Sequence, residues 1–148
     1  MIEYTLIHDA ISLANYISIE ALADFIHYQS IPYEDTKQAI IKAIEYSFSK
    51  DVGKGGFIIV AMDNREVIGA SVVNYSGMDL YIPNVFLVYI AVSEDHRGQG
   101  IGSSIIRKII ENCKGSIALH VEYNNPARSL YERLGFVSKY AEMRLERS

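Results

Sequence analysis

Phe86-Leu87-Val88-Tyr89-Ile90-Ala91-Val92-Ser93-Glu94-Asp95-His96-Arg97-Gly98-Gln99-Gly100-Ile101-Gly102-Ser103-Ser104 is the stretch that decides the fold. Its first seven residues are apolar or aromatic, which predicts a strand buried on both faces. Four polar residues follow, and then an arginine and three glycines at every second position. Beyond them, isoleucines recur at helical spacing with charged residues between them. The stretch therefore predicts a buried strand, a basic glycine-rich turn and an amphipathic helix.

This order of elements offers a place for an anion. The first N–H groups of a helix have no partner inside the helix, and the helix dipole favours negative charge at the same end. Glycines let the backbone approach a ligand closely, because no Cβ intervenes. Arg97 adds a permanent positive charge at the rim. The turn is a candidate pyrophosphate cradle, although the glycines alone are equally compatible with a tight turn that binds nothing.

The spacing of the glycines excludes two well-known phosphate loops. A P-loop needs Lys-Ser or Lys-Thr after its last glycine, but Gly102 is followed by two serines. A dinucleotide fingerprint needs Gly-x-Gly-x-x-Gly, but here the glycines simply alternate. The spacing Arg97-x-x-Gly100-x-Gly102 instead resembles the acetyl-CoA signature of the GCN5-related N-acetyltransferase (GNAT) family, Gln/Arg-x-x-Gly-x-Gly/Ala, which also follows a long apolar strand.

The bulk properties predict one soluble domain spanning residues 1–148. The composition, 49% apolar and 22% charged residues, is ordinary for a globular protein. A net charge of −4 argues against nucleic acid as a general partner. The single Cys113 excludes an internal disulfide and a multi-cysteine metal site. No signal peptide and no uncharged apolar run of about 20 residues is present, so we expect a cytoplasmic protein without a membrane partner or a metal.

The remaining patterns predict strands and helices in the order β-α-α-β-β-β-α-β-α-β. We expect strands at residues 3–7, 57–62, 67–75, 86–92, 116–123 and 136–145, and helices at 9–27, 35–49, 101–113 and 126–134. Asp35 and Gln38 form a capping-box pattern, and Gly69 predicts a bulge or a close backbone approach. The fold class is therefore α/β (α+β), with a mixed, mostly antiparallel central sheet and helices on both faces.

A second motif spans residues 124–136, Asn124-Asn125-Pro126-Ala127-Arg128-Ser129-Leu130-Tyr131-Glu132-Arg133-Leu134-Gly135-Phe136. It resembles the Asn-x-x-Ala-x-x-Leu-Tyr…Gly-Phe segment that follows the fifth strand of the same family. One helix and one strand separate the two motifs, and the resemblance covers the whole chain in element order. By these two motifs the chain resembles a GNAT acetyltransferase.

The resemblance implies a V-shaped opening between the strands 86–92 and 116–123, with acetyl-CoA lying in it and no metal. Backbone groups of Ile90, Ala91 and Val92 are then expected to pair with the pantetheine arm like an added strand. Asn124 is expected to contact the arm. The Asn-Pro pair that some family members use points to Asn125 as the alternative. The pyrophosphate is expected to lie on the turn residues Arg97, Gly98, Gln99, Gly100, Ile101, Gly102 and Ser103.

The implied chemistry is direct transfer of an acetyl group from the thioester to a primary amine of a small molecule or a peptide. A strand N–H, that of Ile90 or Ala91, stabilises the negative charge that develops on the thioester oxygen. The phenol of Tyr131 protonates the departing thiolate. From its position on an apolar helix face alone, Tyr131 would be a core aromatic.

The chain departs from the family in two places. Many members carry a catalytic Glu early on the organising strand, where residues 86–88 offer no carboxylate, and many end with a long hairpin where only residues 137–148 remain. Both departures leave the acceptor and the general base open. Glu122, His120 and Tyr89 are candidate replacements, and strand alternation places His120 and Glu122 on one face. A purely structural role is the alternative for each of them.

Two functions from different classes remain. The first is the N-acetyltransferase, with an acidic and aromatic acceptor cleft around the first helical pair formed by Tyr16, Glu20, Asp24, Tyr28, Tyr33, Glu34 and Asp35. The second is a non-catalytic acyl-CoA-binding sensor or interaction module, which the absent strand carboxylate favours and the retained Tyr131 opposes. The sequence does not name the acceptor amine, and it leaves a homodimer open.

Overall fold

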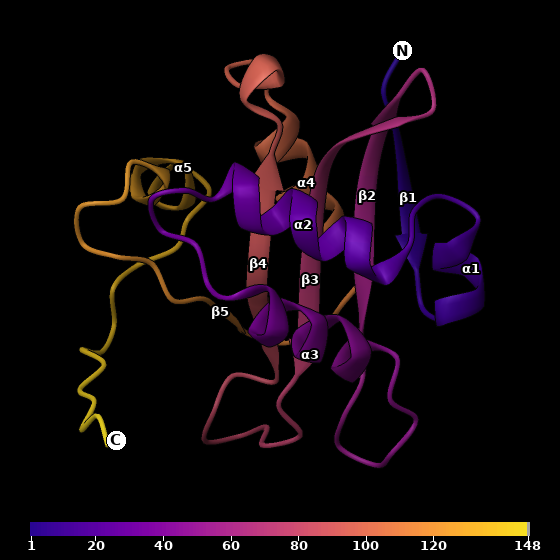
Figure 1. Ribbon diagram of the computed structural model, residues 1–148. Coiled ribbons are helices and arrows are strands. Elements are labelled where there is room, and N and C mark those ends of the chain that lie inside the picture. Colours follow the sequence, from indigo (N-terminus) through magenta and orange to yellow (C-terminus); the bar gives the residue numbers. More distant parts are fainter. Residues whose placement is uncertain (148) are drawn as a thin grey trace.

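A five-stranded sheet forms the centre of the protein in a computed structural model that describes residues 1–147 (Figure 1). The strands lie in sequence order, β1 (Glu3–Ile7), β2 (Gly56–Asp63), β3 (Glu66–Tyr75), β4 (Val85–Val92) and β5 (Ile117–Ala118). The first four pair antiparallel, and β4 pairs with β5 in parallel. The predicted mixed, mostly antiparallel sheet is confirmed. Ser148, the last residue of the predicted domain, lies outside the described residues.

Helices cover both faces of this sheet, as predicted. One face carries α1 (Ala10–Ala14), α2 (Ile19–Gln29) and α3 (Lys37–Ser47), and the other carries α4 (Ile101–Glu111) and α5 (Ala127–Arg133). A short 3-10 helix, Glu94–His96, lies between β4 and α4. In Figure 1, α2 and α3 cross in front of the strands and α4 lies behind them. Each face has its own apolar core, because successive strand residues such as Val72 and Val73 are fully buried on opposite sides.

Hydroxyl caps move two predicted helix boundaries. The helix predicted over residues 9–27 is two helices, because Ser18 accepts a hydrogen bond from the Ala21 amide at 3.1 Å and begins α2 anew. Asp9 caps α1 as predicted, accepting from the Ser12 amide at 2.7 Å. The capping box predicted at Asp35 is wrong, because Thr36 caps α3 instead. Asp35 is thereby left free for another contact.

Two predicted strands are corrected near the C-terminus. β5 contains only Ile117–Ala118 instead of residues 116–123, and residues 136–145 form no strand. Their apolar alternation is present in the sequence, but Val137, Tyr140, Met143 and Leu145 are all exposed. A strand needs a neighbour for its backbone groups, and no sheet edge pairs with this segment in residues 1–147.

A bulge beside Gly69 seats α4 against the sheet. Ala61 pairs with Gly69 and Met62 with Val67, so one residue of β3 is extra. A Cβ on Gly69 would stand 3.1 Å from both Ile101 Cγ2 and Ile105 Cδ1, which are side-chain atoms of α4. Of the two alternatives predicted for Gly69, the bulge is confirmed, and the neighbours of Gly69 are side chains of α4. The absent side chain at Gly69 lets the start of α4 pack closely on the strands.

A second bulge lies on β4. Val72 pairs with Tyr89 and Val73 with Leu87, so Val88 has no partner on β3. A bulge bends its strand and increases the local twist. The pairing of β4 with β5 stops at Phe86. From Leu87 onward, the edge of β4 that faces away from β3 has no strand partner in the described chain, and the sheet opens there.

Gly69→Val is expected to lower the free energy of unfolding by roughly 1–3 kcal/mol, because the added methyl groups overpack the contact with α4. Ile105→Ala in the same chain makes room, so the double variant should lose less than the sum of the two single changes. Denaturant melts of the three variants measure this. Strictly additive losses would show that Gly69 and α4 are not in tight contact.

Candidate functional site

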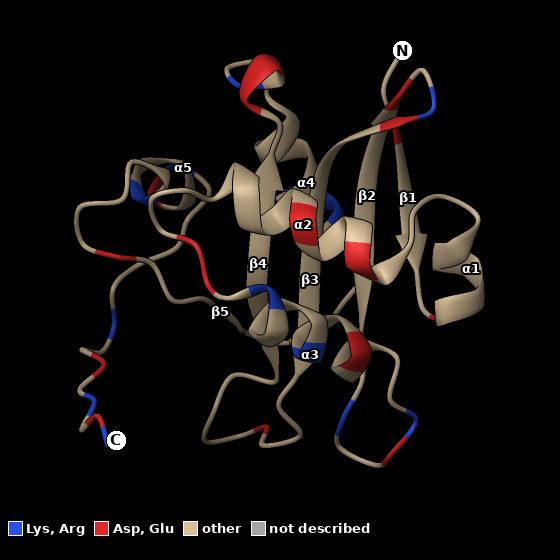
Figure 2. Ribbon diagram, viewed as in Figure 1, with Lys and Arg blue, Asp and Glu red and all other residues tan. Residues whose placement is uncertain are grey.

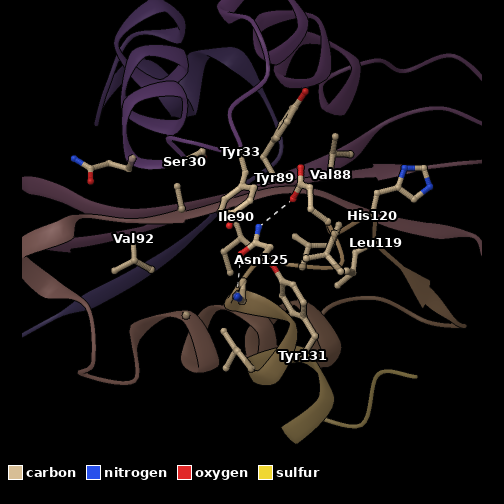
Figure 3. Close-up of a pocket in the computed structure, with 18 of the residues that line it drawn as sticks. Ser30, Tyr33, Val88, Tyr89, Ile90, Val92, Leu119, His120, Asn125 and Tyr131 are labelled. Carbon is tan, nitrogen blue, oxygen red and sulfur yellow. Dashed lines mark hydrogen bonds between the residues drawn. The ribbon is translucent and has the colours of Figure 1, made fainter. Parts of the chain in front are cut away.

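The opened sheet edge is one wall of a cleft with a volume of about 1170 Å³ (Figure 3). The cleft passes from the glycine-rich turn, along β4 and the segment after β5, to the loop between α2 and α3. Gln99 and Asn124 lie outside its lining. The predicted site residues that line it are Ile90, Ala91, Val92, Arg97, Gly98, Gly100, Ile101, Gly102, Ser103, His120, Glu122, Asn125 and Tyr131.

The start of α4 forms one end of the cleft. Gly100 is the N-cap residue with φ of +79°, and no side chain caps the helix, so the first amides are left to the cleft. A Cβ on Gly98 or Gly100 would meet no atom within 4 Å, so both glycines border open space. Gly102 is different, since its Cβ would stand 3.2 Å from Leu130 Cδ2. A side chain at Gly102 would therefore press on α5.

Arg97 holds the turn to two other elements. Its Nε donates to the Val92 carbonyl at 3.2 Å and its Nη2 donates to the Gln29 carbonyl at 2.6 Å. The Gln29 side chain in turn accepts from the Glu94 amide at 2.9 Å. The positive charge therefore stays at the rim of the cleft, as the sequence predicts, and the same bonds fix α2 to the end of β4.

The backbone of β4 presents an open edge beside this turn. Ile90, Ala91 and Val92 pair with Ser71, Ala70 and Gly69 of β3 on one side only. Within residues 1–147 no strand covers their other side. Unpaired N–H and C=O groups along a strand edge are a template for an extended ligand. The geometry thus provides the edge that the predicted contact with a pantetheine arm requires.

Tyr131 enters the cleft from α5, opposite Tyr33 and Tyr89 (Figure 3). Tyr131 is 9% exposed and packs in the core on the α4 side of the sheet, and it also lines the cleft. It is therefore both the core aromatic that its helix face predicts and a residue of the site. Burial raises the pKa of Tyr131 to about 12, and the negative charge of Glu122 adds to the shift. The phenol therefore keeps its proton at neutral pH, which is the state that a proton donor needs.

Asn124 and Asn125 occupy different environments. Asn125 lines the cleft, accepts from the Ala127 amide at 2.9 Å at the start of α5, and donates to Glu122 Oε1 at 3.1 Å. Asn124 lies outside the lining, and its carbonyl accepts from the Tyr33 hydroxyl at 3.2 Å. The loop before α5 is thus ordered by Asn125 and joined by Asn124 to the loop between α2 and α3.

His120 and Glu122 do not share a strand face, because β5 ends at Ala118 and both residues follow it in irregular chain. His120 is exposed, and its ring stands edge-on to Phe86 with the ring centroids 6.1 Å apart. In Figure 3 it projects away from Tyr131. Glu122 is held by Asn125. The prediction of one shared face is wrong, although both residues line the cleft.

The wall opposite Tyr131 contains a bond that the sequence does not signal. The Tyr89 hydroxyl donates to Asp35 Oδ2 at 2.5 Å across a separation of 54 residues. His27 Nδ1 lies 2.8 Å from the Asp35 carbonyl and fixes the loop that carries it. Burial and the bond to Asp35 raise the pKa of Tyr89. The capping pattern at Asp35 pointed to a helix start, so only the fold reveals this contact.

The predicted acidic and aromatic acceptor cleft is only partly assembled. Tyr33 and Asp35 line it, and the five other candidates do not. Figure 2 shows acidic positions along the side of α2 that faces away from the sheet. Asp24, one of them, pairs with Lys37 at 3.0 Å outside the cleft. Glu20 and Asp24 therefore belong to a solvated face of α2, whereas Glu34 and Asp35 lie in the loop before α3.

Neither a metal centre nor a membrane span is found in residues 1–147. No three His, Cys, Asp or Glu side chains of the described chain gather closely enough to hold a metal ion. None of its helices has the length and apolar character needed to cross a bilayer.

Known acetyltransferases resemble this chain in sequence or in fold. Residues 54–138 match the family model of the acetyltransferase (GNAT) domain. N-alpha-acetyltransferase 30 of Schizosaccharomyces pombe is 30% identical over 122 residues, which is 72% of this chain and 81% of that protein. A possible acetyltransferase from Clostridium difficile 630 superposes with a TM-score of 0.69 at 16% identity, covering 100% of this chain and 98% of that one.

A second solved structure, an aminoglycoside N-acetyltransferase in complex with CoA, has a TM-score of 0.69 at 13% identity and covers 99% of this chain and 95% of that one. The two structures share the fold. The family model covers more than half of the chain, so the protein belongs to the GNAT acetyltransferase family. Its predicted class, the N-acetyltransferases, is confirmed.

Gly100→Ala is expected to weaken acetyl-CoA binding by about tenfold or more, which corresponds to about 1.4 kcal/mol, because a Cβ enters the open space before α4 and strains a positive φ. Gly115→Ala is the matched control, since Gly115 follows the same helix with φ of +89°. Calorimetry should show normal affinity for the control at a similar loss of stability. Equal affinity in both variants would remove the turn from the binding site.

Proposed function

We propose that the protein transfers an acetyl group from acetyl-CoA directly to a primary amine of a peptide or a small molecule. The observation that carries the proposal is the unpaired edge of β4, which opens between the uncapped start of α4 and the buried phenol of Tyr131. The family membership supplies the reaction class. Acetyl-CoA fits because the edge, the open glycine turn and the phenol follow one another along one cleft.

The residues proposed to hold acetyl-CoA are backbone groups along two elements. Ile90 to Val92 offer the strand edge for the pantetheine arm, and amides from Arg97 to Ser103 offer donors for the pyrophosphate. We assign the asparagine contact to Asn125, because it lines the cleft and Asn124 does not. When bound, acetyl-CoA supplies an acetyl group activated as a thioester.

The chain's own groups then serve the transfer. The N–H of Ile90 or Ala91 is placed to stabilise negative charge that develops on the acetyl oxygen. Tyr131 donates its proton to the leaving sulfur, and its raised pKa keeps that proton in place at neutral pH. The apolar side chains packed around Tyr131 hold its ring in place at the cleft.

A peptide amino terminus is the acceptor that we favour. N-alpha-acetyltransferase 30 matches 72% of this chain, and its name refers to α-amino groups. The acceptor wall agrees with a cationic ligand, because Tyr33, Tyr89 and Asp35 present aromatic faces and a carboxylate. A small-molecule amine is the second candidate. Cytoplasmic location and assembly as a homodimer stay predictions.

A non-catalytic acyl-CoA-binding module is the alternative of a different class. The absence of a carboxylate at residues 86–88 favours it. The position of Tyr131, protonated and lining the cleft, supports catalysis instead.

Release of free CoA thiol separates the two functions. The protein and acetyl-CoA are mixed with a free α-amino peptide, the same peptide blocked at its terminus but carrying a lysine, and spermidine. We expect thiol release with the free α-amino peptide and an acetylated product by mass spectrometry. Tight acetyl-CoA binding without release for any acceptor would instead support the sensor.

Tyr131→Phe is expected to slow turnover by roughly 10²–10⁴-fold while acetyl-CoA affinity is kept, because the ring still packs but the proton is gone. Tyr123→Phe is the matched control, since Tyr123 lies in the loop just before α5, is exposed and does not line the cleft. Steady-state kinetics and calorimetry measure the two quantities. Full kcat in Tyr131→Phe would assign Tyr131 to packing alone.

A further inference from the structure

The fold supplies a carboxylate to β4 that the strand's own sequence lacks. Residues 86–88 contain none, but Asp35 reaches the strand from the loop between α2 and α3 and accepts a 2.5 Å hydrogen bond from Tyr89. Tyr89 follows the bulged Val88 directly and lines the cleft. The carboxylate therefore meets β4 where the sheet opens, beside the strand edge proposed to hold acetyl-CoA.

The pair joins the cleft to bulk water. Tyr89 is half-buried, whereas Asp35 is exposed, so a proton that reaches the carboxylate can leave to solvent. No salt bridge to Asp35 occurs in residues 1–147. Lys37, the nearest basic residue in the sequence, is engaged by Asp24 at 3.0 Å and by the Tyr28 hydroxyl at 3.1 Å. The carboxylate is thus not neutralised by an ion pair.

We propose that Tyr89 and Asp35 form the relay through which the acceptor ammonium loses its proton. The inference rests on the proposed acetyl transfer and names a path for its deprotonation step. The hydroxyl of Tyr89 has one proton, which is committed to Asp35, and its oxygen lone pairs remain available to an N–H donor. A tyrosine in this position passes a proton on without becoming charged.

The relay passes the ammonium proton to water before the nitrogen attacks the thioester. The ammonium N–H breaks and its proton bonds to Tyr89 Oη, while the original Tyr89 proton moves to Asp35 Oδ2 and from there to water. The neutral nitrogen attacks the acetyl carbon, so a C–N bond forms and the C–S bond breaks. The sulfur takes the proton of Tyr131, and the surplus proton of the new amide restores that phenol. The products are the amide, CoA thiol and one proton released to water.

Other titratable groups near the pair are committed elsewhere or lie apart. Tyr46 donates its hydroxyl proton to the Tyr75 carbonyl at 2.7 Å, and Glu122 is bound by Asn125 and lies beside Tyr131, the proton donor. His27 contacts the backbone carbonyl of Asp35 and not its carboxylate. His120 is the competing proton acceptor, because it also lines the cleft and is exposed.

The test separates the charge from the hydrogen bond. Asp35→Asn keeps an oxygen that accepts from Tyr89 but removes the proton acceptor, and Tyr89→Phe keeps the carboxylate but removes the hydroxyl. Asp24→Asn is the matched control, since Asp24 is an exposed carboxylate of α2 outside the cleft. Each variant is assayed by thiol release with the free α-amino peptide from pH 6 to 10, alongside calorimetric acetyl-CoA affinity and a thermal melt.

We expect Asp35→Asn and Tyr89→Phe each to lower kcat/KM at neutral pH by roughly 10²-fold or more, with acetyl-CoA affinity and melting temperature kept. The loss should shrink as the pH approaches the pKa of the acceptor amine, because the amine then arrives deprotonated. The double variant should lose no more than either single one, since both act in one path. Asp24→Asn should match the wild type.

Three results would overturn the relay. The first is wild-type kcat/KM in Asp35→Asn, and the second is a loss of the same size at every pH, which indicates a positioning role. The third is a pH dependence that disappears in His120→Gln and persists in Asp35→Asn, which assigns the proton to His120. In all three the wild type still releases thiol, whereas failure of the proposed function itself leaves the wild type without release.

Discussion

One extra residue on β4, Val88, is the constraint on which the rest of the site depends. It breaks the regular ladder with β3, and the strand pairs with β5 at only Val85 and Phe86. A sheet that stayed fully paired would satisfy its backbone internally and leave no edge for a ligand. Because the sheet opens here, β4 pairs with β3 along one edge, whereas beyond Phe86 the other edge has no strand partner in the described residues.

Hydrogen bonds from the end of α2 and the loop that follows it join the two sides of this opening. Gln29 accepts from Arg97 at the glycine turn, Tyr33 donates to Asn124 before α5, and Asp35 accepts from Tyr89 on β4. These contacts span 54 to 91 residues of sequence. A shift of this segment therefore acts on the turn, the strand and the loop before α5 together. These hydrogen bonds therefore connect the acceptor side of the cleft to the proposed cofactor side.

The two cores give the cleft walls of different character. On the α4 side, Tyr131 is packed among apolar side chains, and burial raises its pKa to about 12. On the α2 side, burial and the hydrogen bond to the exposed Asp35 also raise the pKa of Tyr89. Both phenols therefore stay protonated at neutral pH, and they differ in their partners. Tyr131 packs against apolar side chains, whereas Tyr89 donates to a carboxylate at the surface.

The sequence by itself determined the elements whose signals are local: the apolar run of β4, the alternating glycines, the isoleucine stripe of α4 and the motif around Tyr131, and with them the family. It missed the break before α2, because Ser18 caps a helix only once the chain has turned there. It overextended β5 and predicted a strand over residues 136–145, because alternation shows which side chains share a face and does not provide a partner edge. The bond between Tyr89 and Asp35 was decided only by the tertiary structure, since a contact between residues 54 positions apart exists only after the bulge has turned β4 and the loop has packed against it.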